Sequence, residues 1–510
     1  MFKQPQQAST RVAFNTMILY AKMLITMGIS LYSTRLVLNA LGASDYGIFS
    51  LIAGVIAMLS FLNAAMTSST QRYLSFHQGT KNFEMQKKVF INSWILHIVI
   101  GVFVVLLLMA LVPFLFGRFL NIPVDRISTA KAIYYFMSVA VFFTIISVPF
   151  TASINAHENM LWIAIVNIIE SGFKLVIALS LVWFIQPERL VVYGILMAVL
   201  SVITFLLYAG FCLKKYDECS VKNYQIDKPL IMELSSFAGW NLFGNLAWIG
   251  RTQGLSIILN IFFGTVVNAA YGIAQQIAGQ VGFFSSTMLR AINPQIMKSE
   301  GMGERQRMLR ISMMASKFGF FLLAFIAVPC IFEMPAILKI WLKNVPDNTV
   351  MFCSLVLVAT MINQLTIGLQ SAVQATGQIK IYQSVVGSIL LLNLPVAYLL
   401  LKAGFPAYSI MISFICIEFI ACMFRLFFLK KIAGLSILEY FIRVFLKEII
   451  PISTIILVCW IITNYVDFEF RFFLTGIISL LIFAGSIYLT GLCADERLLV
   501  NNLLRKVMKR

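Results

Sequence analysis

Four cationic side chains fall inside long apolar stretches of the sequence: Lys22, Arg35, Lys174 and Arg251. A charge within hydrocarbon is costly unless it faces a water-filled cavity or a partner. Arginine can hold phosphate oxygens through a bidentate fork, whereas lysine offers a point charge. We therefore predict that these four residues bind an anionic, phosphate-bearing molecule.

Each cation also has a structural interpretation. Arg35 and Arg251 could instead cap helix carbonyls or extend to the membrane interface, and Lys22 could reach the headgroups. Lys174 follows Glu170 by four residues, which places both on one face of a helix as an ion pair.

Further polar residues accompany these cations. Arg72 and Arg290 end two apolar stretches and are candidates for a cytoplasmic entrance, although anchoring at the interface explains them as well. Glu418 lies near the middle of a stretch, seven residues before Arg425, and either couples transport to a proton or sodium ion, as Glu170 could, or pairs with a cation on another helix. Amides that could line a polar cavity, or join helices, are Asn245, Asn260, Gln275, Gln276, Gln280, Gln364, Gln370 and Gln374.

The composition requires lipid as the solvent for most of the chain. Of the 510 residues, 60% are hydrophobic and 12% are charged, with a mean hydropathy of +0.90. Apolar runs of about 20 residues predict membrane-spanning helices, because the bilayer demands internal backbone hydrogen bonds. Fourteen such runs are predicted at 13–41, 47–71, 90–116, 131–154, 160–184, 191–213, 237–263, 267–290, 312–333, 350–374, 380–402, 407–428, 444–464 and 470–492.

The basic residues predict the orientation. With the N-terminus on side one, alternate connections on that side hold twenty-seven of the 39 Lys and Arg residues, and those on the other side hold eight. Lys317 and Arg425, near the ends of their spans, are counted with the connections of side one, and the four cations named above complete the total. Side one, with both termini, is therefore predicted to be cytoplasmic. The net charge of +18 is explained by this placement, so nucleic acid is not an expected partner.

An internal repeat relates the two halves of the chain. Tyr46-Gly47-Ile48 and Tyr271-Gly272-Ile273 are each followed by Ala-Gly. Upstream, Gly42 follows Leu38-Asn39 by three residues, as Gly264 follows Leu259-Asn260 by four. We predict two pseudo-symmetric six-helix lobes around a central cavity, at 1–215 and 216–432, with a two-helix segment and a basic cytoplasmic tail at 433–510.

The stretch Arg35 to Gly47, continuing to Gln71-Arg72-Tyr73-Leu74, resembles bacterial polysaccharide flippases of the Wzx type. These belong to the multidrug/oligosaccharidyl-lipid/polysaccharide (MOP) exporter superfamily, which also contains the MATE drug exporters. Asn293-Pro294 and the turn from Gln374 to Gly377 are similar to that family too.

The resemblance implies an all-α, MATE-like fold and alternating-access transport of undecaprenyl-pyrophosphate-linked oligosaccharide across the bacterial inner membrane. The implied partners are this lipid-linked substrate, membrane lipids, a coupling ion, and a polysaccharide polymerase with its chain-length regulator. The alternative is a proton- or sodium-coupled drug/cation antiporter of the same superfamily. No enzymatic motif and no cysteine or histidine pattern for a metal is present, so we expect neither catalysis nor a cofactor.

Overall fold

The computed structural model describes residues 3–57, 60–119, 122–183, 188–220, 226–342, 345–468, 470–498 and 500–501. Regular structure throughout these ranges is helical, which confirms the predicted all-α class. The chain divides into two compact units, Phe14–Leu242 and Phe243–Arg510 with Met1–Ala13. The predicted division at 215 and 432 stays a prediction, and the predicted basic tail beyond residue 501 lies outside the described residues.

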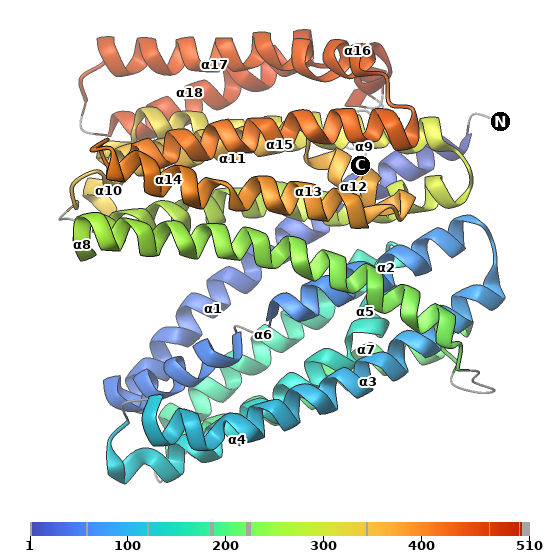
Figure 1. Cartoon of the computed structure of the whole chain (residues 1–510), viewed down its shortest axis with the longest axis vertical. Helices are drawn as coiled ribbons and strands as arrows, with labels where there is room; N and C mark the ends of the chain where they lie inside the picture. The colour runs from blue at the N-terminus through green and yellow to red at the C-terminus, as the bar shows by residue number, and fades with distance from the viewer. Residues whose placement is uncertain are drawn as a thin grey trace. The chain divides into compact units, whose positions relative to one another are not determined.

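The first unit is a bundle of mostly long helices (Figure 1). In it α4 packs against α3 and α7, and α2 packs against α3 and α5. Its helices are α1 (Lys3–Ala57), α2 (Ser60–Gly79), α3 (Phe83–Phe114), α4 (Ile127–Ile146), α5 (Val148–Ala156), α6 (Met160–Trp183), α7 (Arg189–Lys215) and the start of α8 (Lys228–Gly301), with short turns η1 (Leu115–Phe119), η2 (Val124–Arg126) and η3 (Asp217–Cys219).

The second unit contains most of α8 and all later helices. The pair α17 and α18 forms an outer layer of this unit and packs on α9, while α15 contacts α11, α13 and α14 (Figure 1). Its helices are α9 (Arg305–Phe332), α10 (Met334–Leu342), α11 (Thr349–Gln364), α12 (Ile367–Thr376), α13 (Ile379–Leu391), α14 (Asn393–Lys402), α15 (Ser409–Ala433), α16 (Ile437–Tyr440), α17 (Leu446–Tyr465) and α18 (Arg471–Ser486), with π-helical turns η4 (Phe441–Phe445) and η5 (Ile487–Gly491).

One glycine bends the first long helix of each unit. Gly42 in α1 has φ 77° and ψ 167°, and Gly264 in α8 has φ 77° and ψ −166°. Only glycine adopts this backbone region readily, because a Cβ would clash with the backbone. The two glycines that the repeat aligned therefore share one conformation.

Eleven helices within the described residues are long and apolar enough to span a membrane, and the bent pair α11 and α12 makes twelve. The two other predicted spans, 47–71 and 267–290, are the segments that follow the two glycine bends. The second of these carries many amides and hydroxyls, such as Gln275, Gln276, Gln280 and Ser285, which lowers its hydropathy although it is helical.

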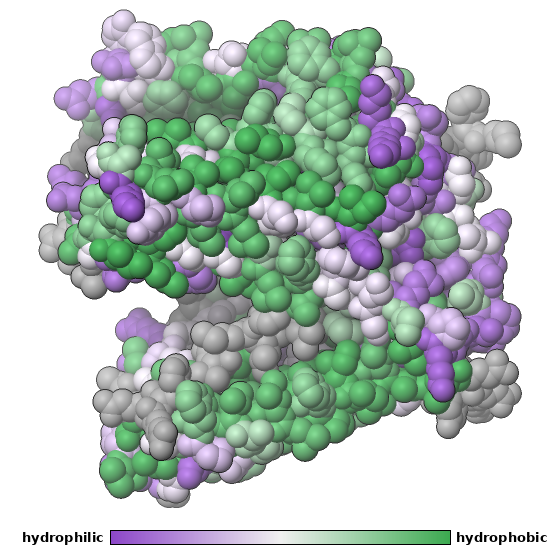
Figure 2. Space-filling model, in the orientation of Figure 1, coloured by the Kyte–Doolittle hydropathy of each residue, from purple (hydrophilic) through white to green (hydrophobic). Residues whose placement is uncertain are grey.

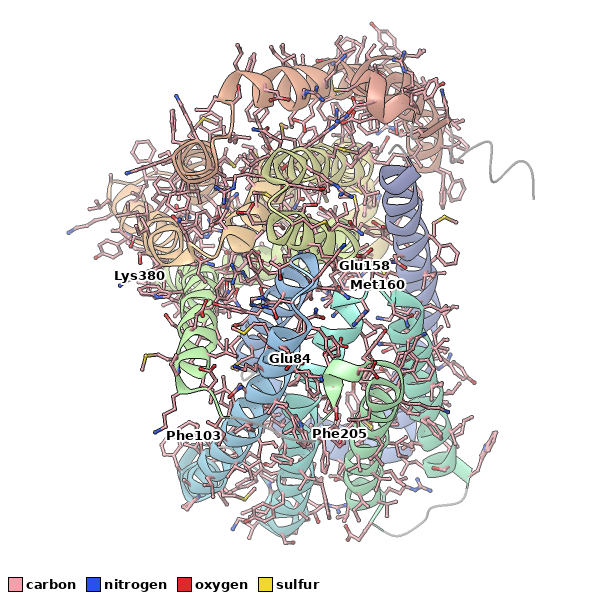
Figure 3. All side chains as sticks on the ribbon, turned by 90° about the vertical axis from the view of Figure 1, so that its right-hand side faces the viewer. Glu84, Phe103, Glu158, Met160, Phe205 and Lys380 are labelled. Carbon is pink, nitrogen blue, oxygen red and sulfur yellow. The ribbon has the colours of Figure 1, made fainter. Side chains whose placement is uncertain are left out.

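The outer surface of each unit suits a bilayer. Figure 2 shows hydrophobic side chains over the middle of the helices and hydrophilic ones gathered near helix ends. Phe103 of α3 is 63% exposed on such a surface. Phe205 of α7 is half-buried, with its ring 5.7 Å from that of Phe143 and 5.8 Å from that of Phe150 (Figure 3). The chain is a multi-pass membrane protein.

Candidate functional site: a buried charge cluster in the second unit

Glu418 of α15 is the centre of a buried polar cluster. One carboxylate oxygen, Oε2, accepts a hydrogen bond from Nη1 of Arg251 at 2.9 Å. The other, Oε1, accepts from Nδ2 of Asn363 at 2.5 Å and from Nη2 of Arg425 at 3.5 Å. The Glu418 side chain is 2% exposed, so its charge is compensated by protein groups and not by water.

Arg251 reaches this cluster from α8. Its guanidinium carbon lies 3.9 Å from the centre of the Phe414 ring, a cation–π contact. Its Nε is buried and donates to no acceptor among the described residues. One donor of this guanidinium is therefore left over after the ion pair with Glu418 is made.

Arg425 completes the cluster from α15. Its Nε donates to the hydroxyl of Tyr382 at 3.0 Å, and its Nη1 donates to Oγ1 of Thr366 at 3.2 Å. Thr366 and Asn363 flank the 42° bend between α11 and α12, so the cluster ties α8, α13 and α15 to a break in a span. Two guanidinium groups face one carboxylate, which leaves an excess of one positive charge.

The sequence reasoning missed part of this cluster. Arg425 was assigned to a cytoplasmic connection and was not considered as a partner of Glu418, yet the two side chains form an ion pair. The signal was present in their spacing, because residues seven apart lie on the same face of a helix. Of the two interpretations of Glu418, the structure shows the pairing with a cation on another helix.

Lys317 was also assigned to a connection but is buried in α9 at 1% exposure. Its Nζ donates to Oε2 of Glu496 at 2.5 Å and to the backbone carbonyl of Arg443 at 3.1 Å. Glu448 of α17, not singled out from the sequence, is 3% exposed, and neither of its carboxylate oxygens has a hydrogen-bond partner among the described residues. The spans therefore hold a buried acid in addition to Glu170 and Glu418, the two acids singled out from the sequence.

The predicted cations of the first unit lie in different surroundings. Arg35 is exposed on α1, and Lys22 is half-buried. Nζ of Lys174 donates to Oε1 of Glu170 at 2.6 Å across one turn of α6, so the ion pair expected from their spacing is present. Both side chains remain partly exposed.

The two residues predicted at the cytoplasmic entrance differ as well. Arg72 is buried at 7% exposure, with its guanidinium 4.5 Å from the ring centre of Tyr73 and 5.5 Å from that of Phe237. Arg290, the equivalent residue of the second unit, is exposed. The rings of Tyr73 and Phe237 hold the Arg72 guanidinium in place, whereas the Arg290 side chain is accessible.

The predicted cavity amides differ in how far their side chains are exposed. Asn260, Gln276 and Gln280 are exposed, whereas Asn245, Gln275, Gln370 and Gln374 are half-buried. Gln364 is buried and accepts a hydrogen bond from Oγ of Ser285 at 2.5 Å. Gln364 thus joins two helices, as the structural interpretation of the amides expected.

The fold and family are known from other proteins. A family model described as "Polysaccharide biosynthesis protein" matches residues 12–300, and no curated protein matches the chain. A MATE in the bent conformation is 14% identical, with 84% of this chain and 97% of that chain covered at a TM-score of 0.73. An outward-facing multidrug resistance MATE family transporter of the MOP superfamily is 13% identical, with 84% and 96% covered at 0.71.

A MOP superfamily transporter from Pyrococcus furiosus, for which reverse polarity of the binding pocket suggests a different function, is 14% identical, with 84% and 96% covered at a TM-score of 0.72. At these identities the likeness establishes the fold, which is that of the MOP-superfamily transporters. Because the family model spans more than half of the sequence, the chain belongs to the polysaccharide biosynthesis protein family. This confirms the resemblance seen in the sequence.

Proposed function

We propose that this protein is a flippase for undecaprenyl-pyrophosphate-linked oligosaccharide, such as the repeat unit of O-antigen, capsule or exopolysaccharide. It moves this molecule from the cytoplasmic to the periplasmic leaflet of a bacterial inner membrane by alternating access between the predicted lobes, coupled to a proton or sodium ion. Both termini are cytoplasmic, and a polysaccharide polymerase with its chain-length regulator uses the product.

The observation that carries this proposal is the excess of positive charge in the buried cluster. A pyrophosphate needs compensating charge at membrane depth, because its transfer into hydrocarbon is prohibitive. Arg251 retains a donor, Nε, with no acceptor among the described residues. A phosphate oxygen is the strong acceptor that such a donor lacks.

Arg35, Lys22 and Lys174 are proposed to contribute further positive charge along the path, and Arg72 and Arg290 to attract the phosphate at the cytoplasmic side. Half-buried amides such as Gln275 and Gln370 are proposed to bind sugar hydroxyls, since an amide can both donate and accept. Glu170 and Glu418 are the proposed groups for ion coupling.

The alternative function, drug or cation antiport, favours carboxylates that are available to a cationic cargo. Glu418 is already engaged by Arg251, Arg425 and Asn363. A cationic drug would have to displace a guanidinium from it, which makes this acid a poor binding site for such a drug.

The test is complementation of a mutant that lacks export of a lipid-linked oligosaccharide. Variants Arg35→Ala and Arg251→Gln are compared with the double variant Arg251→Gln/Glu418→Gln, which removes the cation together with its carboxylate partner. Lys402→Gln, at the end of α14, is the control for loss of one positive charge. We expect export to fall at least about tenfold, equivalent to about 1.4 kcal/mol, in the Arg251 single and double variants and to persist in the control.

Protein abundance in the membrane distinguishes a transport defect from a folding defect. Efflux of a cationic dye is measured in the same strains. Normal export by the double variant, together with dye efflux that depends on Glu418, would favour the antiporter and overturn the proposal.

A further inference from the structure

A cavity of about 460 Å³ lies in the second unit where the end of the chain folds back on the start of α17. Its lining residues are Arg443, Lys447, Leu492, Cys493, Ala494, Asp495 and Arg497. Three of these seven side chains are cationic and one is acidic. None of the residues that line the cavity belongs to the cluster around Glu418.

Two of the cations retain hydrogen-bonding capacity. Lys447 lines the cavity and makes no hydrogen bond or ion pair with any residue that the structure describes. Arg497 donates through Nη2 to the backbone carbonyl of Leu489 at 2.8 Å, while its Nε is buried and lacks an acceptor within the described ranges. These are donors that suit an anion in the cavity.

The acids near the cavity are already matched by arginines. Asp495 pairs with Arg310 and lies 3.7 Å from Nη1 of Arg443, and Oε1 of Glu439 forms an ion pair with Nε of Arg443 at 3.0 Å. Burial alone would raise the pKa of Asp495, but the Arg310 and Arg443 guanidiniums outweigh it and hold this pKa below its ordinary value. Asp495 is thus ionised and already paired with arginines. The positive charge of Lys447 is therefore left uncompensated.

The walls of the cavity are held by a buried ion pair. Lys317 donates both to Glu496 and to the carbonyl of Arg443, and the backbone N–H of Cys493 donates to Oε2 of Glu496 at 2.8 Å. Lys317 therefore fixes the two segments that carry the cavity cations. Glu448, although adjacent to Lys447 in the chain, does not line the cavity.

Exposed apolar side chains occupy the same segments. They are Phe441 at 46%, Ile442 at 48%, Leu446 at 44%, Leu489 at 69% and Leu498 at 63% exposure. A site that combines uncompensated cations with neighbouring apolar surface suits a phosphate carried on a lipid better than a free ion.

From this arrangement we infer that the cavity between Arg443, Lys447 and Arg497 is a binding site for a phosphate group, as presented by an anionic phospholipid headgroup. The site is independent of the proposed transport substrate. On the predicted topology it opens at the cytoplasmic leaflet, where anionic lipids would anchor the α17 and α18 pair.

Lipid binding by the purified full chain tests this inference. Native mass spectrometry counts phosphatidylglycerol and phosphatidylcholine adducts, and thermal unfolding is followed in phosphatidylcholine nanodiscs with increasing phosphatidylglycerol. Inorganic phosphate is titrated in a parallel series. We expect phosphatidylglycerol to bind and to raise the unfolding temperature, and Lys447→Gln to weaken this binding roughly fivefold, the usual effect of one basic residue at an anionic surface.

Two further variants separate binding from folding. Asp495→Asn removes the only acid that lines the cavity and leaves Arg443 paired with Glu439 alone. It should therefore strengthen phosphatidylglycerol binding, a direction that a merely structural role would not give. Lys430→Gln removes an exposed charge of α15 in the same unit, outside the cavity, and should leave binding unchanged.

The comparison between series identifies the source of the phosphate. Stabilisation by phosphatidylglycerol alone supports a lipid headgroup, and equal stabilisation by inorganic phosphate supports a soluble phosphate in the same cavity. Equal binding of both lipids, or equal losses in Lys447→Gln and Lys430→Gln, would overturn the inference.

Discussion

Arg251 of α8 and Glu418 of α15 form an ion pair that is almost entirely withdrawn from solvent, although 167 residues separate them in the chain. Arg425 supports the same carboxylate at 3.5 Å. Removing one partner of a buried pair leaves a bare charge, which typically costs about 3–5 kcal/mol. The unequal numbers of cations and acids decide which removal costs more.

Glu418→Gln is expected to destabilise the second unit more than Arg251→Gln. The first change leaves two buried guanidinium groups without a carboxylate, whereas the second leaves Glu418 still compensated by Arg425. We expect a loss of about 3–5 kcal/mol for Glu418→Gln, measured by thermal or denaturant unfolding in detergent. Glu170→Gln, which breaks the partly exposed pair of α6, is the control and should cost less than about 1 kcal/mol; a similar cost for both would show that the buried cluster is not stabilising.

Gly42→Ala and Gly264→Ala are expected to destabilise the protein although a Cβ has open space at both positions. The cost comes from the backbone, since φ 77° with an extended ψ is a region that alanine avoids, and strain of this kind costs about 1–3 kcal/mol. Gly47→Ala and Gly272→Ala are matched controls, because these glycines are helical, have the same open space and lack a positive φ.

Unfolding temperatures of the four alanine variants measure this effect. The controls should be neutral or slightly stabilised, because alanine is the better helix former by up to about 1 kcal/mol. Equal behaviour of Gly42→Ala and Gly47→Ala would argue that the bend is not a fixed feature of the first unit.

Glu448→Gln is expected to leave the unfolding temperature unchanged or to raise it. The carboxylate is buried and receives no hydrogen bond from any described residue, so removing its charge removes a desolvation cost. Glu418→Gln is the same chemical change but is expected to lower the unfolding temperature. The comparison therefore distinguishes a carboxylate without a partner from a paired one. A large loss of stability in Glu448→Gln would reveal a partner for this carboxylate that the structure does not show.

Local sequence features were sufficient for several conclusions. Hydropathy located the spanning helices, because a membrane segment is defined by about 20 consecutive residues. The spacing of Glu170 and Lys174 predicted their contact, since helical geometry alone brings such residues together. The repeat also aligned Gly42 with Gly264, and a glycine bend is encoded at the position where it occurs.

The partners of the buried charges could not be read in this way. The sequence located Arg251 and Glu418 along the chain, but only the contact between α8 and α15 decided that they meet. Tertiary packing also buries Arg425 and Lys317, although the sequence counted both with cytoplasmic connections. The apolar residues around each charge in its own helix show that burying this charge is costly. The choice of the group that offsets this cost belongs to tertiary structure, because the compensating groups lie on other helices.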